Sequence, residues 1–259
     1  MSFNYKRVLL VGATSGIGAA MADKLVVEGA KVIAVGRRQE RLDAFVQKHG
    51  PEKASAVRYD INDTAGLDAF VESIVSKYPD LDCVFLNSGV QSQIKLSRPA
   101  EVDLDAFHQE VNTNFHRLVD LSIKFLPHLL GKPSPTALVI TNSLLSQVPA
   151  CLMPAYSASK AALNAFVYCL RRQNRGASTK IIEIWPPAVQ TELHDYMGAE
   201  RGRAIGMPLA EFVEQTWSQL AAGSEEVIVG ADEDYMKLVA HRQNRFEAMS
   251  DLLEKHMAA

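Results

Sequence analysis

Short apolar runs alternate with segments of helical periodicity along the chain. The apolar runs occupy residues 7–12, 31–36, 55–60, 81–89, 136–143, 180–187 and 225–230. Runs of this length that are apolar at consecutive positions are typical of strands buried on both faces of a sheet. Between the runs, apolar residues recur three and four positions apart. This spacing predicts amphipathic helices, including a long helical region at about 103–130.

The repeated order of strand and helix predicts βαβ units. Such units form a parallel sheet, and right-handed crossovers place helices on both of its faces. The chain contains no repeat, low-complexity tract or linker. We therefore predict one α/β domain over residues 1–259, with a doubly wound, Rossmann-like, seven-stranded parallel sheet. Ligands of such sheets bind beyond the carboxyl ends of the strands, so candidate chemistry is expected there.

Composition excludes several classes of function. The 27 basic and 30 acidic residues among 259 give a net charge of −3, so the composition lacks the excess of basic residues that is typical of nucleic-acid-binding proteins. No apolar run is long enough for a membrane span, and the N-terminus lacks a signal-peptide cleavage region, so a cytoplasmic protein is expected. The histidines lack zinc-binding spacing, so no metal is expected. The few cysteines fit a reducing compartment, and their apolar surroundings predict that all are buried: Cys83, Cys151 and Cys169.

A glycine-rich segment, GATSGIG, follows the first predicted strand. Gly12, Gly16 and Gly18 permit a sharp turn and the close approach of a ligand to the backbone. The helix that starts near Gly16 offers free N–H groups and a positive dipole end, which suit a pyrophosphate. A glycine-rich turn without a ligand is the alternative. Three glycines at the first strand–helix junction favour a dinucleotide.

Two arginines follow the second predicted strand, where many NAD-binding sheets carry an acidic residue for the ribose hydroxyls. An acidic residue repels a 2′-phosphate, whereas Arg37 and Arg38 can bind one, so the sequence favours NADP(H) over NAD(H). Alternatively, both arginines are solvated residues at a helix start. After the third strand, Asp60, followed by Ile61, either accepts a hydrogen bond from an adenine amino group or caps the next helix.

The segment YSASK places Tyr156 and Lys160 on one face of a predicted helix. A nearby ammonium lowers the pKa of a phenol, and a tuned phenol exchanges a proton with a carbonyl or alcohol oxygen. Ser143, at the end of the fifth strand, is placed to hold the same oxygen by a hydrogen bond. An ordinary amphipathic helix with a snorkelling lysine is the alternative. The combination with the glycine turn favours hydride transfer, in which a cofactor supplies the hydride.

These motifs give the chain a resemblance to the classical short-chain dehydrogenases/reductases, which extends over residues 8 to about 230. GATSGIG is similar to the cofactor turn of that family, and NSG at 87–89 is similar to its Asn-Ala-Gly motif. YSASK is similar to the catalytic segment, and Ser143 occupies the matching position upstream. The family also has an asparagine thirteen residues before a proline, and Pro127 selects Asn114 for this position.

The resemblance implies a role for each member of this set. Tyr156 transfers the proton, Ser143 polarises the substrate oxygen, and Lys160 holds the ribose and lowers the tyrosine pKa. Asn114 distorts its helix and holds a water that relays protons to the lysine. A homodimer or homotetramer is also implied. The cofactor-binding residues, from the motifs and the resemblance together, are Gly12, Thr14, Ser15, Gly16, Ile17, Gly18, Arg37, Arg38, Asp60, Ile61, Asn87, Gly89, Tyr156, Lys160, Pro186, Val189 and Thr191.

The substrate cover of the family follows the sixth strand, and here it is expected at 192–212. Gly198, Gly202 and Gly206 predict a mobile lid. His194 is interpreted as a solvated loop histidine. The expected pocket residues are mostly apolar and favour a medium-sized ketone, aldehyde or secondary alcohol: Leu144, Leu145, Val148, Met153, His194, Tyr196 and Met197.

The sequence thus predicts an NADP(H)-dependent carbonyl reductase or alcohol dehydrogenase. Two alternatives stay open. A dinucleotide-sensing binding protein uses such a fold without catalysis, although it has no need of Ser143, Tyr156 and Lys160 together. An epimerase or dehydratase on the same fold keeps its hydride internal, and it would retain the cofactor and show no net turnover of added NADPH.

Overall fold

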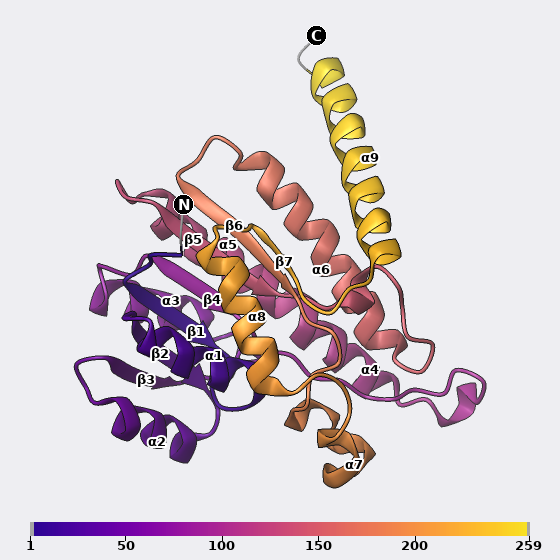
Figure 1. Cartoon of the computed structure of the whole chain (residues 1–259), viewed down its shortest axis with the longest axis horizontal. Coiled ribbons are helices and arrows are strands. Elements are labelled where there is room, and N and C mark those ends of the chain that lie inside the picture. The colour runs from indigo at the N-terminus through magenta and orange to yellow at the C-terminus, as the bar shows by residue number, and fades with distance from the viewer. Residues whose placement is uncertain (1–2, 258–259) are drawn as a thin grey trace. The chain divides into compact units, whose positions relative to one another are not determined.

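A computed structural model describes residues 3–257 of the chain and contains a seven-stranded parallel sheet. The strand order is β3-β2-β1-β4-β5-β6-β7 (Figure 1). The predicted strands are all present, with shorter bounds at several ends: β1 (Arg7–Val11), β2 (Lys31–Gly36), β3 (Ala54–Arg58), β4 (Cys83–Leu86), β5 (Thr136–Thr141), β6 (Thr179–Trp185) and β7 (Glu226–Ile228). The fold class predicted from the apolar pattern is therefore confirmed.

Helices cover both faces of the sheet and form two separate hydrophobic layers. One face packs against α1 (Gly16–Val27), α2 (Gln39–His49) and α8 (Leu209–Ala221). The other packs against α3 (Leu67–Lys77), α5 (Arg117–Leu130) and α6 (Pro154–Gln173). Because side chains alternate along a strand, each central strand contributes to both layers, and its sequence is apolar at consecutive positions.

The long helical region predicted at 103–130 has three parts. An α-helix, α4 (Leu104–Val111), leads into a π-helical turn, η2 (Asn112–His116), which continues directly into α5. Asp103 caps α4, because its carboxylate accepts a hydrogen bond from the Ala106 N–H at 2.9 Å. No helix among residues 3–257 is both long and apolar enough to cross a membrane.

The chain divides into two compact units, residues 1–229 and 230–259. The first contains the whole sheet. The second contains a long helix, α9 (Glu233–Met257). The prediction that every cysteine is buried is wrong, because only Cys83 is buried. Cys151 lies in a turn and Cys169 on α6, and both are exposed.

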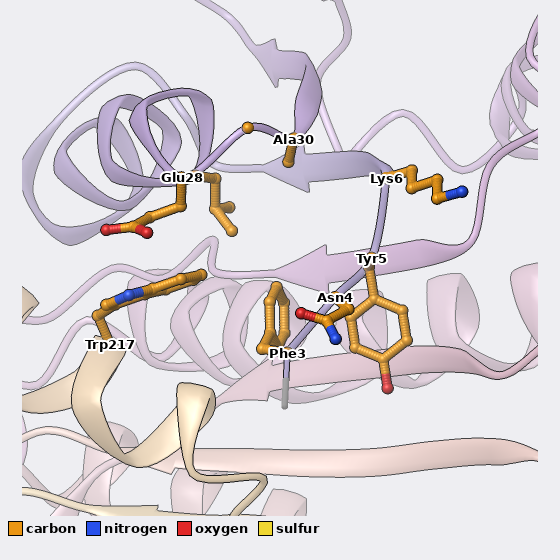
Figure 2. A pocket seen from close by; sticks show the side chains of 9 residues that line it. Phe3, Asn4, Tyr5, Lys6, Glu28, Ala30 and Trp217 are labelled. Carbon is orange, nitrogen blue, oxygen red and sulfur yellow. The ribbon is translucent and has the colours of Figure 1, made fainter. Parts of the chain in front are cut away.

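A pocket of about 170 Å³ lies at the amino ends of β1 and β2. Figure 2 shows Phe3 and Trp217 lining it, with their ring centroids 5.7 Å apart. Ligands of parallel sheets bind at the opposite, carboxyl edge. The pocket therefore lies away from the predicted chemistry and extends the hydrophobic layer beneath α1 and α8.

Candidate active site

The glycine turn occupies the point where the strand order reverses, between β1 and β4. Gly12 has a φ of 92°, and a Cβ there would lie 2.7 Å from the Ser88 backbone nitrogen. A Cβ at Gly18 would lie 2.0 Å from the Gly12 carbonyl oxygen. Only glycine fits these two positions, because the turn packs closely against itself and against the segment after β4. The start of α1 offers N–H groups to a phosphate. The turn thus fits the pyrophosphate of a dinucleotide.

Arg38 lies beside this turn, whereas Arg37 lies farther out. Arg38 donates from Nε to Thr14 Oγ1 at 3.2 Å and from Nη2 to Ser15 Oγ at 2.7 Å. Arg37 is largely exposed, and its nearest carboxylate is Asp60, at 3.8 Å. The sequence prediction missed Arg41, which reaches the Thr14 carbonyl oxygen at 2.9 Å. Because Arg41 lies on α2, one turn beyond Arg38, helical spacing is the signal that identifies it.

A carboxylate from a distant segment pairs with these arginines. Glu192 accepts hydrogen bonds from Arg38 Nη1 at 2.8 Å and from Arg41 Nη1 at 2.9 Å. It begins η4 (Glu192–Met197), the first part of the predicted lid. The lid and the predicted phosphate-binding residues are therefore joined by ion pairs.

Asp60 forms a local turn rather than a helix cap. Its Oδ1 accepts a hydrogen bond from the Asn62 N–H at 3.0 Å. The capping alternative is wrong, because α3 begins only at Leu67, after Gly66. Ile61 is buried in the layer that contains α3.

Asn87 and Gly89 follow β4 and lie beside the glycine turn. Asn87 accepts a hydrogen bond from Thr141 Oγ1 at 2.9 Å, and its amide nitrogen lies 3.5 Å from the Gly12 carbonyl oxygen. A Cβ on Gly89 would lie 3.4 Å from Asn114 Oδ1 and 4.0 Å from Lys160 Nζ. The three strand ends β1, β4 and β5 are thereby brought together, as the parallel topology predicts.

Asn114 lies in the π-helical turn η2, so the helix is distorted at the residue that the resemblance selects. Its side chain pairs with one backbone amide: Oδ1 accepts from the Val90 N–H and Nδ2 donates to the Val90 carbonyl oxygen, both at 2.8 Å. This pairing fixes the segment after β4.

Ser143, Tyr156 and Lys160 converge at the carboxyl end of β5. Ser143 Oγ accepts a hydrogen bond from the Leu145 N–H at 3.1 Å, and the Ser143 side chain lowers the pKa of the Tyr156 phenol. Lys160 Nζ lies 5.7 Å from the centroid of the Tyr156 ring and donates to the Thr141 carbonyl oxygen at 2.9 Å. All three side chains are buried, and Lys160 is only 3% exposed.

Burial governs both pKa values of the pair. It raises the pKa of Tyr156 to about 12, against the effect of the Ser143 side chain, and the Glu110 carboxyl raises it further. We expected Lys160 to lower the tyrosine pKa, but Lys160 is not among the groups that shift it in this structure, where burial has the largest effect. Burial also lowers the pKa of Lys160 to about 8, and the negative charge of Glu183 opposes the change.

Glu183 is a functional candidate that the sequence prediction missed. It lies on β6, is fully buried and accepts hydrogen bonds from the side-chain amides of Asn142 and Asn164, the latter at 3.1 and 3.2 Å. Asn142 directly precedes Ser143, and Asn164 lies one turn after Lys160 on α6. Glu183 thus connects the strand end to the helix. Its signal is a carboxylate within an otherwise apolar strand, which is rare unless the charge is paired.

The remaining predicted cofactor residues lie around the end of β6. The Pro186 carbonyl oxygen accepts a hydrogen bond from the Leu144 N–H at 3.0 Å. Val189 is buried and forms a parallel bridge with Met207. Thr191 lies against the glycine turn, since a Cβ on Gly16 would be 3.2 Å from Thr191 Cβ.

The lid is helical and closely packed. It comprises η4 and the short helix α7 (Ala199–Arg203). A Cβ on Gly202 would lie 2.1 Å from the His194 carbonyl oxygen, so close packing accounts for this glycine. Val148, an expected pocket residue, is about half exposed.

The interpretation of His194 as a solvated histidine is wrong. The side chain is buried, and Nδ1 lies 3.0 Å from Gln91 Oε1. The Tyr196 hydroxyl donates to the same oxygen at 3.1 Å. Burial lowers the pKa of His194 below its ordinary value. The error arose because the partner, Gln91, lies more than a hundred positions away in the sequence.

A parallel sheet with a dinucleotide turn and a convergent serine, tyrosine and lysine defines a nucleotide-dependent oxidoreductase. The family model described as short chain dehydrogenase matches residues 6–202. The chain belongs to the short-chain dehydrogenase family. An uncharacterized oxidoreductase, DltE, from Bacillus subtilis (strain 168) is 32% identical over 228 residues, which cover 88% of this chain and 89% of the relative.

Solved structures with the same fold hold nicotinamide dinucleotides. A short-chain dehydrogenase from Burkholderia cenocepacia J2315 in complex with NADP has a TM-score of 0.76 at 25% identity, covering 96% of this chain and 98% of that one. A Burkholderia phymatum short-chain dehydrogenase/reductase in complex with NAD has a TM-score of 0.81 at 19% identity, covering 96% of each chain. A nicotinamide dinucleotide is therefore supported as the cofactor.

Proposed function

We propose that this protein is an NADP(H)-dependent carbonyl reductase or alcohol dehydrogenase in which Tyr156 transfers the proton. The observation that carries the proposal is the convergence of buried Ser143, Tyr156 and Lys160 beside the glycine turn. A binding protein without catalysis gains nothing from burying a lysine next to a phenol, because burial of an ammonium is costly.

The proposed mechanism assigns one step to each side chain. When bound, the nicotinamide supplies a hydride to the carbonyl carbon in reduction and accepts one from the carbinol carbon in oxidation. In reduction, Ser143 Oγ donates a hydrogen bond to the carbonyl oxygen, and the Tyr156 hydroxyl gives that oxygen its proton. The Lys160 ammonium stabilises the phenolate that remains. A pKa of about 12 keeps Tyr156 protonated at neutral pH, which suits a proton donor.

The proposed preference for NADP(H) rests on Arg38. Its hydrogen bonds to Thr14 and Ser15 hold the guanidinium beside the glycine turn. The Ser15 hydroxyl and the Arg38 guanidinium can then both donate hydrogen bonds to a 2′-phosphate. Arg37, which is more exposed, adds a second positive charge.

The test is a fluorescence titration with NADPH and NADH, followed by a panel of ketones and aldehydes added to the tighter complex. We expect NADPH to bind more tightly and to be oxidised with part of the panel. Tyr156→Phe is expected to bind the cofactor normally and to lose about 10²–10⁴-fold in turnover, the range for general acid catalysis. Tyr168→Phe, a buried tyrosine on the same helix, is the matched control and should retain turnover.

Either of two results would contradict the proposal. Unchanged turnover in Tyr156→Phe would remove the tyrosine from proton transfer. Tight NADPH binding without oxidation on any carbonyl would instead favour a dinucleotide sensor or an enzyme with an internal hydride step.

A further inference from the structure

Glu110 is a buried carboxyl group to which the proposed mechanism assigns no role. Glu110 lies on α4, one turn before Asn114, and is only 4% exposed. A glutamate is almost never buried to this extent unless its charge is paired. Burial raises its pKa above the ordinary value, and the hydrogen bond with Ser92 opposes that change.

Within the described part of the chain, one of the two carboxyl oxygens of Glu110 has a hydrogen-bond partner and the other has none. Oε2 accepts a hydrogen bond from Ser92 Oγ. Oε1 is buried without a hydrogen-bond partner among residues 3–257. An unsatisfied buried acceptor costs about 1–3 kcal/mol, and more when it is charged. A group outside the chain that donates to Oε1 would recover this energy.

The surroundings of Glu110 belong to the substrate side of the site. Ser92 follows Gln91, which binds His194 and Tyr196 of η4. The Glu110 carboxyl also raises the pKa of both Tyr156 and Tyr196, so its charge acts on the phenol that exchanges the proton. Three separate segments, the one after β4, α4 and the lid, thus form a polar cluster that includes the buried Glu110 and His194, and α4 packs against α6, the helix that carries Tyr156.

We propose that Glu110 determines substrate specificity by accepting, at Oε1, a hydrogen bond from an ammonium or hydroxyl group that the substrate carries near its reacting carbon. This proposal rests on the proposed function and deepens it, because it names amino- and hydroxy-substituted alcohols or carbonyls as the substrate class. An ionised carboxylate is an acceptor only, so a substrate with a second carboxylate at this position is disfavoured.

An ammonium group is the stronger ligand. It forms a charge-assisted hydrogen bond, which contributes about 1.5–3 kcal/mol against about 1 kcal/mol for a neutral one. Its positive charge also offsets the negative charge of Glu110, which otherwise raises the pKa of Tyr156. An aminated substrate therefore improves both its own binding and the proton exchange with the phenol.

The experiment compares four secondary alcohols oxidised by the cofactor-loaded enzyme: 2-butanol, 2,3-butanediol, 3-amino-2-butanol and 3-hydroxybutyrate. The pH is kept between roughly 7 and 9, where the amine is protonated. For the wild type we expect kcat/KM to be highest for the amino alcohol, then the diol, then 2-butanol, and lowest for the carboxylate. In Glu110→Gln the ratio of kcat/KM for the amino alcohol to that for 2-butanol should fall at least tenfold. Glu101→Gln, an exposed glutamate, is the matched control and should keep the ratio.

Binding provides a readout that does not depend on turnover. The thermal shift that 3-amino-2-butanol gives to the cofactor-loaded protein should be larger for the wild type than for Glu110→Gln. A difference in binding without turnover supports the subsite and counts against the proposed reaction. An equal loss for all four alcohols in Glu110→Gln, or an unchanged ratio, overturns the subsite. Oxidation of 2-butanol by the wild type would still support the reductase.

Discussion

Burial and a neighbouring carboxyl group shift the pKa of Lys160 in opposite directions. Burial favours the neutral amine and lowers the pKa to about 8, while the charge of Glu183 favours the ammonium. Burial also raises the pKa of Glu183, to about 7. The hydrogen bond from Asn142, the charge of Arg171 and the hydrogen bond from Asn164 oppose this rise. The ammonium to which we assign stabilisation of the phenolate is therefore favoured by a carboxyl group on the neighbouring strand, β6.

This balance predicts a specific pH profile. If Lys160 must be charged, kcat/KM for carbonyl reduction should be constant below about pH 8. Above that pH it should fall, because the Lys160 ammonium loses its proton above its pKa. In Glu183→Gln the negative charge is gone, the lysine pKa falls, and the decline should begin at lower pH. Stopped-flow or steady-state pH profiles of both proteins measure this shift.

The matched control for the profile is Glu225→Gln. Glu225 pairs with Lys180, away from Lys160, so this change should leave the profile in place. A lower kcat in Glu183→Gln with the same pH dependence would show that Glu183 does not set the pKa of Lys160. Its role would then be to connect Asn142 and Asn164 by hydrogen bonds.

At the scale of elements, the lid and the cofactor face share one ion-pair cluster. Arg38 and Arg41 extend from the start of α2, and Glu192 reaches them from η4. Exposed ion pairs contribute about 0–1 kcal/mol each. A phosphate bound by Arg38 would compete with Glu192 for the same guanidinium.

The arginines should discriminate between the two nicotinamide cofactors. Replacing Arg37 and Arg38 together by alanine is expected to weaken the binding of NADPH by roughly 10–100-fold. This is the equivalent of the about 1.5–3 kcal/mol that charge-assisted hydrogen bonds contribute. NADH, which lacks the 2′-phosphate, should change far less. Fluorescence titrations of both cofactors measure the ratio, and Arg98→Ala, on an exposed loop, controls for net charge. An equal loss for the two cofactors would reject the phosphate assignment.

At the scale of the molecule, the two hydrophobic layers stabilise the sheet on which every site residue depends. Leu121 on α5 is 1% exposed and packs in the layer that also contains α3 and α6. Leu104, at the start of α4, is 62% exposed. The same substitution at these two leucines therefore separates the effect of burial on stability from the effect of changing leucine to alanine.

Leu121→Ala should destabilise the protein by about 2–5 kcal/mol, because the change removes buried methyl groups and leaves a cavity. Leu104→Ala should change the free energy of unfolding by only about 0.5 kcal/mol or less. Urea denaturation measures both values. Similar losses in the two variants would show that the layer between α5 and the sheet does not limit stability.

The sequence predicts contacts that follow from local pattern and misses those that depend on distant partners. The strands, the helices and the glycine turn have local signals, because burial on both faces and tight turns restrict the residue types allowed. His194, Glu183 and Glu110 were misread or missed. Each is a buried polar side chain that hydrogen-bonds to a group from another element, such as Gln91 for His194. The sheet brings these groups together, and no window of the sequence contains both partners.

The π-helical turn at 112–116 also fixes the phase between the two halves of the long helix. An α-helix turns about 100° per residue, so losing a single residue here would rotate α4 by that angle relative to α5. Glu110 would swing away from Ser92, although no contact residue had been changed. The number of residues between Glu110 and Arg117 is thus a constraint on this site in its own right. Insertions and deletions in this interval would be as damaging as the loss of Asn114 itself.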